Sequence, residues 1–252
     1  MIEVFLLSIV QGITEFIPVS SSAHLILFSN LFNFNSENLT IDVSLHFGSF
    51  TAIVFYFRKE ILDFLKNKNL FFLIIISSLP VLFFGFLLIK LDLITNLRSI
   101  KIIGWTTLLF GIILYFSDLR ATKNKINSDF NLKCAIIIGL IQILALIPGV
   151  SRSGITISTA RFLQFERSEA AKISFWLSIP TLGAIGFYNI QKLIKINEFT
   201  ITIENYFAML ASFVFSLIAI KYFTKYLIAS IEKTKDARIA KLFSIVIVRL
   251  FV

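Results

Sequence analysis

Two short polar segments interrupt long apolar stretches of this 252-residue chain. The first is Pro-Val-Ser-Ser-Ser at 18–22, and the second is Pro-Gly-Val-Ser-Arg-Ser-Gly at 148–154. In each segment serines begin the part after the break, where they can cap a helix and leave its first backbone N–H groups free. Those N–H groups and the positive end of the helix dipole attract anions. Two such helix starts facing one cavity predict an anion site, and phosphate is the natural ligand.

Each segment has one charged residue beside it or within it. Arg152 is the only arginine well inside an apolar stretch, and its planar guanidinium can hold a phosphate through two hydrogen bonds. Glu15 lies about one turn before Pro18, where the helix dipole and the surrounding hydrocarbon both disfavour a carboxylate. Either a divalent cation shared with a phosphate or Arg152 itself can compensate Glu15. Catalysis or metal binding is the favoured role, and a structural ion pair is the alternative.

Helical spacing places two more groups beside these residues. Gln11 precedes Glu15 by four residues and shares its helix face, where an amide can coordinate or hydrogen-bond but cannot act as a base. His24 follows Ser21 by three residues, the arrangement that lets a base activate a hydroxyl or a water. The alternative for a membrane histidine is an interhelical hydrogen bond, which is the favoured interpretation of His46. The remaining hydroxyls can contact phosphate or bond back to helix carbonyls: Ser20, Ser22, Ser151, Ser153 and Thr156.

The elements that must position these residues are membrane helices. The chain is 57% hydrophobic and only 15% charged, and its mean hydropathy is +0.86, which excludes a soluble globular enzyme. Six apolar runs are long enough to cross a bilayer, at 43–57, 70–89, 101–117, 170–190, 204–228 and 238–252. The stretches 1–34 and 132–163 are broken at their middle. Such backbone at membrane depth must be buried in protein or line a wet cavity, which predicts two re-entrant helical hairpins.

The two hairpins resemble each other at a constant offset of 131 residues. The matching pairs are Gln11 with Gln142, Val19 with Val150, Ser20 with Ser151, Ser22 with Ser153, and Ala23 with Gly154. Paired broken helices in two halves are typical of inverted repeats with a site at the membrane midplane. The predicted fold is therefore an all-α polytopic membrane protein, with 1–252 as a single membrane domain and repeat halves at about 1–117 and 132–252.

Basic residues predict the orientation. Three spans separate the hairpins, so one hairpin opens on each face of the membrane. Of the 24 Lys and Arg residues, 17 fall on the face that holds 58–69, 118–133, 161–172 and 221–241, which is therefore cytoplasmic. The first hairpin then enters from outside, and the two tips meet near the membrane centre. This bias also accounts for the net charge of +9, so no nucleic-acid partner is expected. One cysteine and two histidines exclude an intrachain disulfide and a zinc cluster.

At these residues the sequence resembles the bacterial undecaprenyl-diphosphate phosphatase family, the bacitracin-resistance type of integral membrane lipid phosphatase. The matching segments are QGITEFIPVSSSAH at 11–24, DVSLHFGSFTAIV at 42–54 and PGVSRSGITIS at 148–158, and with the hydropathy pattern they cover essentially the whole chain. The resemblance implies removal of the terminal phosphate of undecaprenyl diphosphate, which recycles the lipid carrier for cell-wall synthesis and confers bacitracin resistance. It also implies a divalent cation, Mg²⁺ or Ca²⁺, and a site open to the outer face of the inner (plasma) membrane, among membrane lipid.

The matching positions carry the expected roles. The expected catalytic residues are Glu15, Ser21, His24 and Arg152, with Glu15 also the metal ligand. The expected substrate-binding residues are Gln11, Ser20, Ser22, Ser151, Ser153, Gly154 and Thr156. Several members of the family have a second carboxylate where this chain has Gln11, so Glu15 must carry more of the metal-binding role.

Two functions remain open on the sequence alone. In the leading one, Arg152 and the two helix starts hold a diphosphate, and Ser21 or water attacks it with assistance from His24. The alternative is a transporter or flippase of an anionic or lipid-phosphate substrate, because broken helices in inverted repeats are a transporter architecture. The combination of Ser, His, Glu and Arg in one cavity favours chemistry. The sequence leaves the attacking group and the oligomeric state open, with a homodimer as one alternative.

Overall fold

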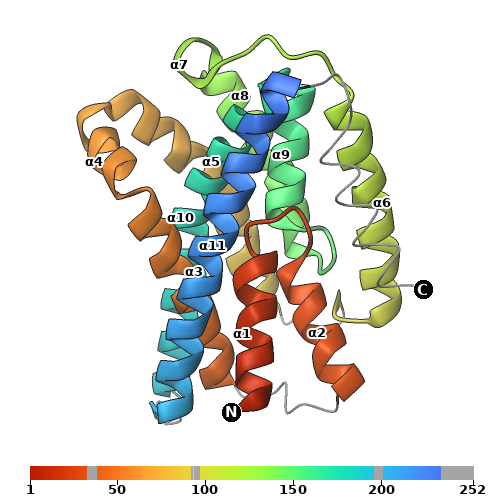
Figure 1. Cartoon of the computed structure of the whole chain (residues 1–252), viewed down its shortest axis with the longest axis vertical. Helices are drawn as coiled ribbons and strands as arrows, with labels where there is room; N and C mark the ends of the chain where they lie inside the picture. Colours follow the sequence, from red (N-terminus) through yellow and green to blue (C-terminus); the bar gives the residue numbers. More distant parts are fainter. Residues whose placement is uncertain (33–38, 92, 94–96, 196–200, 234–252) are drawn as a thin grey trace.

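The structure is a computed structural model that describes residues 1–32, 39–91, 93, 97–195 and 201–233. Within these ranges the regular elements are helices (Figure 1). Five of them are long and apolar enough to cross a membrane: α3 (Leu39–Tyr56), α5 (Lys68–Lys90), α6 (Ile100–Asp118), α10 (Arg167–Lys195) and α11 (Ile203–Lys233). They coincide with five of the six predicted spans, and the sixth, 238–252, lies outside the described residues. This pattern is typical of a multi-pass membrane protein.

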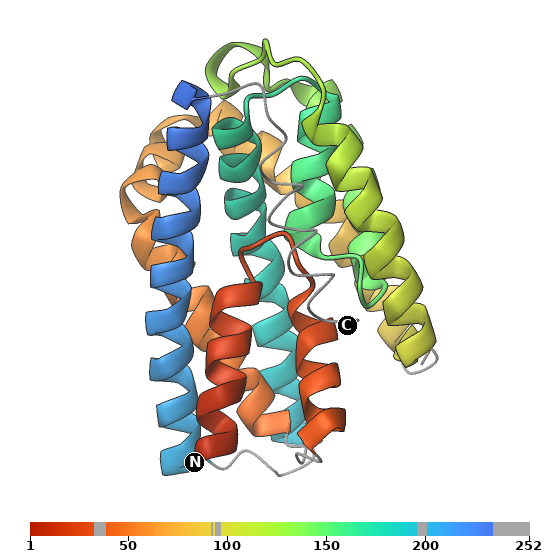
Figure 2. The ribbon, with the colours of Figure 1, turned by 45° about the vertical axis from the view of Figure 1, so that its right-hand side comes forward.

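The two interrupted stretches form helical hairpins that approach each other from opposite ends of the molecule. The first consists of α1 (Ile2–Thr14) and α2 (Ser21–Phe32). The second consists of α8 (Leu132–Gln142), the 3₁₀ turn η2 (Ile143–Leu146) and α9 (Arg152–Phe162). Figure 2 shows both connecting loops near the mid-height of the molecule. The helices α3, α5 and α6 lie between the hairpins in the chain, as the predicted topology requires.

Residues of the two loops explain why the helices end and restart there. A proline has no N–H to continue a helical ladder, and Pro18 and Pro148 stand in the two loops. Gly149 has a φ of +95°, a region that L side chains rarely adopt. Ser151 then caps α9, because its hydroxyl accepts a hydrogen bond from the Gly154 N–H at 3.1 Å. The prolines, Gly149 and the capping serine of these segments therefore account for the turns at the two tips.

Small residues allow α1 and α3 to pack closely against α11. A Cβ on Gly12 would lie 2.7 Å from the Cβ of Phe215, and a Cβ on Gly48 would collide with the Met209 carbonyl. The hydroxyl of Ser49 forms hydrogen bonds of 3.0 Å with both Ser212 and Ser216. Small residues and hydroxyls of this kind are the usual means by which helices associate in lipid. They hold α1, and therefore the first hairpin, in place.

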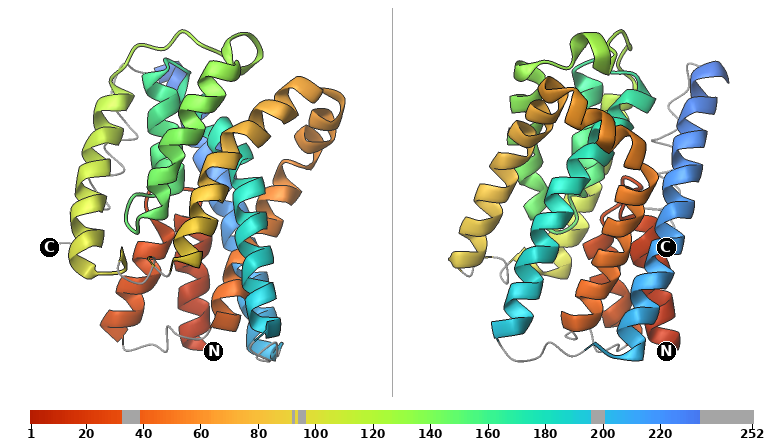
Figure 3. Two further views of the ribbon diagram at one scale, coloured as in Figure 1. Left: turned by 180° about the vertical axis from the view of Figure 1, so that it is seen from behind. Right: turned by 90° about the vertical axis from the view of Figure 1, so that its left-hand side faces the viewer.

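A second group of contacts places α10 behind the hairpin tips. Figure 3 shows α5, α10, α3 and α11 side by side, with α10 in contact with both α3 and α5. The fully buried Phe16 of the first loop packs edge-on against Phe175 of α10, with ring centroids 6.0 Å apart. Helix α10 also contacts α9. It therefore supports both hairpins at once.

A buried ionic cluster fixes the far end of the second hairpin. Arg161, near the end of α9, is almost completely buried and donates to the carbonyls of Asp118 and Arg120 at 2.9 Å. Arg167, at the start of α10, donates from Nε to the Asp118 carboxylate at 2.7 Å. Because a buried charge is tolerated only when it is paired and hydrogen-bonded, this cluster ties α6, α9 and α10 together.

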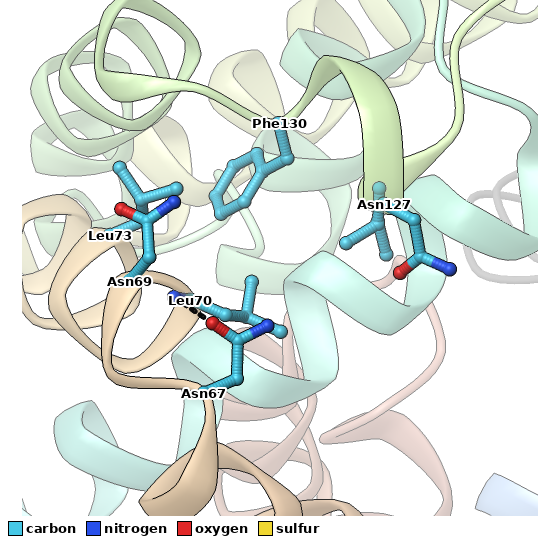
Figure 4. Close-up of a pocket in the computed structure, with 7 residues that line it drawn as sticks. Asn67, Asn69, Leu70, Leu73, Asn127 and Phe130 are labelled. Carbon is cyan, nitrogen blue, oxygen red and sulfur yellow. Dashed lines mark hydrogen bonds between the residues drawn. The ribbon is translucent and has the colours of Figure 1, made fainter.

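A cavity of about 220 Å³ lies at the same end of the molecule as this cluster. It is formed where the short helix α4 (Arg58–Lys66) meets α5, beside α7 (Ile126–Asp129). Figure 4 shows the amides of Asn67, Asn69 and Asn127 beside the apolar side chains of the cavity. The side chain of Asn67 accepts a hydrogen bond from the Leu70 N–H. None of the predicted site residues lines this cavity. The hairpin tips, and not this cavity, are therefore the candidate site.

Candidate active site

The two hairpin tips are joined by direct hydrogen bonds. The N–H of Gly149 donates to the hydroxyl of Ser20 at 3.3 Å, and the hydroxyl of Ser153 donates to the carbonyl of Ile17 at 2.9 Å. Each bond links residues that are well over a hundred positions apart in the chain. The starts of α2 and α9 therefore lie next to each other, as the inverted arrangement predicted.

The Glu15 carboxylate is the centre of the contacts between the tips. It follows the last residue of α1 and is only 7% exposed. Its Oε1 accepts a hydrogen bond from Nη2 of Arg152 at 2.7 Å. Its Oε2 accepts from the Ser21 hydroxyl at 2.7 Å and from the Gln11 amide at 3.0 Å. The Ser21 hydroxyl and the Arg152 guanidinium thus both bind the Glu15 carboxylate, one at each of its oxygens, where the two helix starts meet.

Ser21 and Arg152 occupy equivalent positions in the two hairpins. Each is the first residue of its helix, α2 or α9, and they are separated by the same offset of 131 residues as the other matched pairs. Both therefore lie at the positive end of a helix dipole. The guanidinium of Arg152 also donates to the Ser174 carbonyl of α10 at 3.4 Å. The two hairpins thus bring a neutral hydroxyl from one side and a positive charge from the other.

His24 has a different partner from the one that its spacing suggested. Its Nδ1 lies 2.6 Å from the carbonyl of Ser20, the residue just before α2. Because a carbonyl oxygen can only accept, Nδ1 carries the proton, and Nε2 of the neutral ring is left as the acceptor. The Ser21 hydroxyl donates to Glu15, so His24 and Ser21 share a helix face without a hydrogen bond between them.

The predicted substrate-binding hydroxyls differ in their surroundings. Ser22 is exposed, and its hydroxyl lies 3.2 Å from that of Ser20. Ser151 and Ser153 are buried, with their hydroxyls 3.2 Å apart. Thr156 is fully buried, and its hydroxyl oxygen lies 2.8 Å from both the Arg152 carbonyl and the Ser174 hydroxyl. The tip serines thus surround the junction, whereas the hydroxyl of Thr156 is used in packing α9 against α10.

Gly154 contributes space to the tip contact. A Cβ at this position would lie 3.1 Å from the Cβ of Ser151 and 3.5 Å from the Pro18 carbonyl. The first distance is tighter than ordinary van der Waals contact, so a larger residue would press on the cap of α9 and approach the first tip.

His46 joins the site, although the sequence favoured only an interhelical hydrogen bond for it. It lies on α3, where its Nδ1 is 3.0 Å from Nε2 of Gln11 and 4.0 Å from Oε2 of Glu15. The hydrogen bond to Gln11 is indeed interhelical, but Gln11 also binds the central carboxylate. The signal in the sequence was the position of His46 inside the matching segment DVSLHFGSFTAIV.

Comparison with known proteins identifies the family. The family described as "Bacitracin resistance protein BacA" matches residues 4–234, which is most of the chain. The chain belongs to the BacA family. It is 48% identical over 227 residues to the undecaprenyl-diphosphatase of Pelagibacter ubique (strain HTCC1062), covering 90% of this chain and 88% of that protein. It is 43% identical to the undecaprenyl-diphosphatase of Jannaschia sp. (73% and 74%) and 39% identical to that of Chromohalobacter salexigens (88% of each). The resemblance seen in the motifs is thus confirmed.

The donor set of this BacA-family chain fits a cation only in combination with phosphate oxygens. Within the described ranges no group of three or more His, Cys, Asp or Glu residues could hold a metal ion. Glu15 is the one carboxylate at the junction of the tips, and both of its oxygens already accept hydrogen bonds. Mg²⁺ is commonly held by one or two carboxylates together with substrate phosphates and water. The residues therefore match that mode, and not a cage of protein ligands.

Proposed function

We propose that this BacA-family chain is an undecaprenyl-diphosphatase. It hydrolyses the terminal phosphate of undecaprenyl diphosphate and so returns undecaprenyl phosphate, the lipid carrier, to cell-wall synthesis. The observation that carries the proposal is the contact among Ser21, Glu15 and Arg152 at two adjoining helix starts. A nucleophile hydrogen-bonded to a base, beside a fixed positive charge, is the arrangement that phosphoryl transfer requires.

The proposed reaction begins at Ser21. Its oxygen attacks the terminal phosphorus while Oε2 of Glu15, 2.7 Å away, takes the hydroxyl proton. The bond between that phosphorus and the bridging oxygen breaks, and undecaprenyl phosphate leaves. Arg152 and the backbone N–H groups at the starts of α2 and α9 stabilise the charge that develops on the phosphoryl oxygens. Water then attacks the phosphorus of the phosphoserine and gives a proton to Nε2 of His24, the proposed base for this step. The bond between that phosphorus and the Ser21 oxygen breaks, the Ser21 oxygen takes back the proton held by Glu15, and inorganic phosphate is released.

A divalent cation completes the proposed site. Glu15 would hold Mg²⁺ or Ca²⁺ together with oxygens of the diphosphate. When bound, the cation neutralises part of the diphosphate charge. Ser20, Ser22, Ser151 and Ser153 are proposed to contact phosphate oxygens, because their hydroxyls surround the junction of the tips.

The proposed setting is the bacterial inner membrane. The two hairpins are proposed to be re-entrant, one in each half of an inverted repeat with halves at about 1–117 and 132–252, and the sequence predicts 238–252 as the sixth span. The support is that three long helices separate two hairpins that point at each other (Figure 2). The 17 basic residues of the more basic face support a first hairpin that opens to the outside. The site then receives the diphosphate from the outer leaflet.

Phosphate release in detergent tests the proposed function. The purified protein is mixed with undecaprenyl diphosphate in detergent micelles, and free phosphate is measured over time. Micelles offer no two compartments, so a transporter cannot produce a signal there. We expect steady release that depends on added Mg²⁺ or Ca²⁺. Binding of the lipid without any release of phosphate would favour the transporter or flippase and overturn the proposal.

The paired N–H donors of the Arg152 guanidinium are expected to contribute to the rate of phosphate release as much as its charge does. Arg152→Lys keeps one positive charge but loses the paired donors that can bind two oxygens of one phosphate. Phosphate release is expected to fall by at least tenfold, on the order of a lost bidentate contact in the transition state. The measurement is initial rate against substrate concentration. A variant with near-wild-type rates would show that Arg152 is only the partner of Glu15.

The proposed orientation is testable with single cysteines. In a Cys134→Ser background, Thr122→Cys and Lys195→Cys each place a thiol at an exposed position. The first is in the connection between α6 and α7 and the second is the last residue of α10, and these two segments lie at opposite ends of the bundle (Figure 3). A membrane-impermeant thiol reagent added outside intact cells is expected to label only Lys195→Cys. Permeabilised cells serve as the control, because both variants should then react. Labelling of Thr122→Cys alone in intact cells would show that the orientation is the reverse of the proposed one.

A further inference from the structure

Gln11 connects the Glu15 carboxylate to a histidine on another helix. The side chain of Gln11 is completely buried, and its Nε2 lies 3.0 Å from both Oε2 of Glu15 and Nδ1 of His46. An amide nitrogen carries two hydrogens, so it can serve both acceptors at once. The opposite orientation of the amide would place its oxygen against the carboxylate, with two acceptors facing each other. The amide is therefore held in one orientation by its two partners.

This contact determines the tautomer of the neutral His46 ring. Because the Gln11 N–H donates to Nδ1, that nitrogen is an acceptor, and the neutral ring carries its proton on Nε2. Nε2 lies 4.0 Å from Oδ1 of Asp42, one turn earlier on α3. His46 thus has a carboxylate on each side, Glu15 from the first hairpin and Asp42 from its own helix. The imidazole ring therefore lies between Asp42 on α3 and the Gln11 amide that binds Glu15.

The function of Gln11 depends on this histidine. Without an acceptor at the position of Nδ1, one buried N–H of Gln11 would have no partner, and leaving a buried donor unsatisfied costs free energy. The amide would then turn toward another acceptor, because its Oε1 has no hydrogen-bond partner within the described part of the chain to hold it. Its hydrogen bond to Oε2 of Glu15 would be lost with that rotation.

We propose that His46 is a positioning residue for the reaction at Glu15. Acting through the amide of Gln11, it orients the carboxylate oxygen that takes the proton of Ser21. It does not act as a base itself, because an amide N–H₂ group stands between the imidazole and the carboxylate. The inference rests on the proposed phosphatase function and adds to it a residue from outside both hairpins.

Kinetics of three variants test the inference. His46→Ala is expected to lower kcat about tenfold, the equivalent of one hydrogen bond to a charged group. The KM for undecaprenyl diphosphate should stay within about twofold, since Arg152 and the helix starts are unchanged. His46→Gln offers a carbonyl oxygen to Gln11 and is expected to recover most of the lost rate. The double variant of His46→Ala with Gln11→Ala should be no slower than Gln11→Ala alone.

The controls separate this inference from the proposed function. Thr51→Ala changes another polar residue of α3 whose hydroxyl bonds only to its own helix, and it should keep the wild-type rate. His46→Leu preserves side-chain volume and carries the same test if His46→Ala does not fold. If the wild type is active and both His46→Ala and His46→Leu keep its kcat, the inference about His46 is overturned while the proposed function stands. The inference is also overturned if the losses from His46→Ala and Gln11→Ala multiply in the double variant. A wild-type protein that releases no phosphate would instead overturn the proposed function and the inference with it.

Discussion

Ser21→Ala is expected to abolish phosphate release, with a loss of at least about 10⁴-fold, because the proposed nucleophile is removed and nothing replaces it. The fold should survive this change. Glu15 keeps its hydrogen bonds to Arg152 and Gln11, so its charge remains compensated. The same assay on His24→Ala is expected to leave slow turnover that increases at alkaline pH, since a lost general base typically costs about 10² to 10⁴ and hydroxide partly replaces it.

Trapping of the intermediate completes this test. Rapid quenching of the wild-type reaction with substrate labelled in its terminal phosphate should leave label on the peptide that contains Ser21. Thr14→Ala is the matched control, because Thr14 adjoins Glu15 and its hydroxyl bonds only to the Val10 carbonyl of the same helix. Measurable turnover in Ser21→Ala, label on His24, or no labelled residue at all would count against serine attack and favour direct attack by water.

Glu15→Gln is expected to lower kcat by about 10³-fold, in the middle of the range for loss of a general base. The substitution keeps the size and shape of the side chain but removes the group that takes the Ser21 proton. It also places an amide where Arg152, Gln11 and Ser21 all donate, so at least one of these donors loses a good acceptor. The variant should therefore also unfold at a lower temperature than the wild type.

A cation titration distinguishes the two proposed roles of Glu15. If Glu15 is also the ligand of a divalent cation, Glu15→Gln should need a higher Mg²⁺ concentration for half of its residual rate. Glu15→Asp keeps the charge on a shorter side chain and is the matched comparison, with an expected loss of only about 10- to 100-fold. A Glu15→Gln variant with wild-type kcat would refute the base role. An unchanged Mg²⁺ requirement would refute the ligand role.

Local sequence patterns were sufficient to predict the long helices of this fold and the positions of its two hairpin turns. Apolar runs of membrane length predicted α3, α5, α6, α10 and α11, because each run must satisfy its backbone within one helix. Proline and serine at 18–22 and 148–154 predicted where the two hairpins turn, since a missing N–H ends one helix and a side-chain oxygen caps the next. The ordered motifs around these turns were also sufficient to identify the family.

Tertiary structure decided which of these residues are partners. Helical spacing showed that His24 shares a face with Ser21, but the Ser21 hydroxyl donates to Glu15, which directly follows the preceding helix. The bond from Arg152 to Glu15 joins residues 137 positions apart, and that from Gln11 to His46 joins residues 35 apart. Periodicity within a helix fixes relative directions on that helix alone. Contacts between helices depend on how closely the helices approach and rotate, and here glycine and serine contacts against α11 and the support of α10 set both.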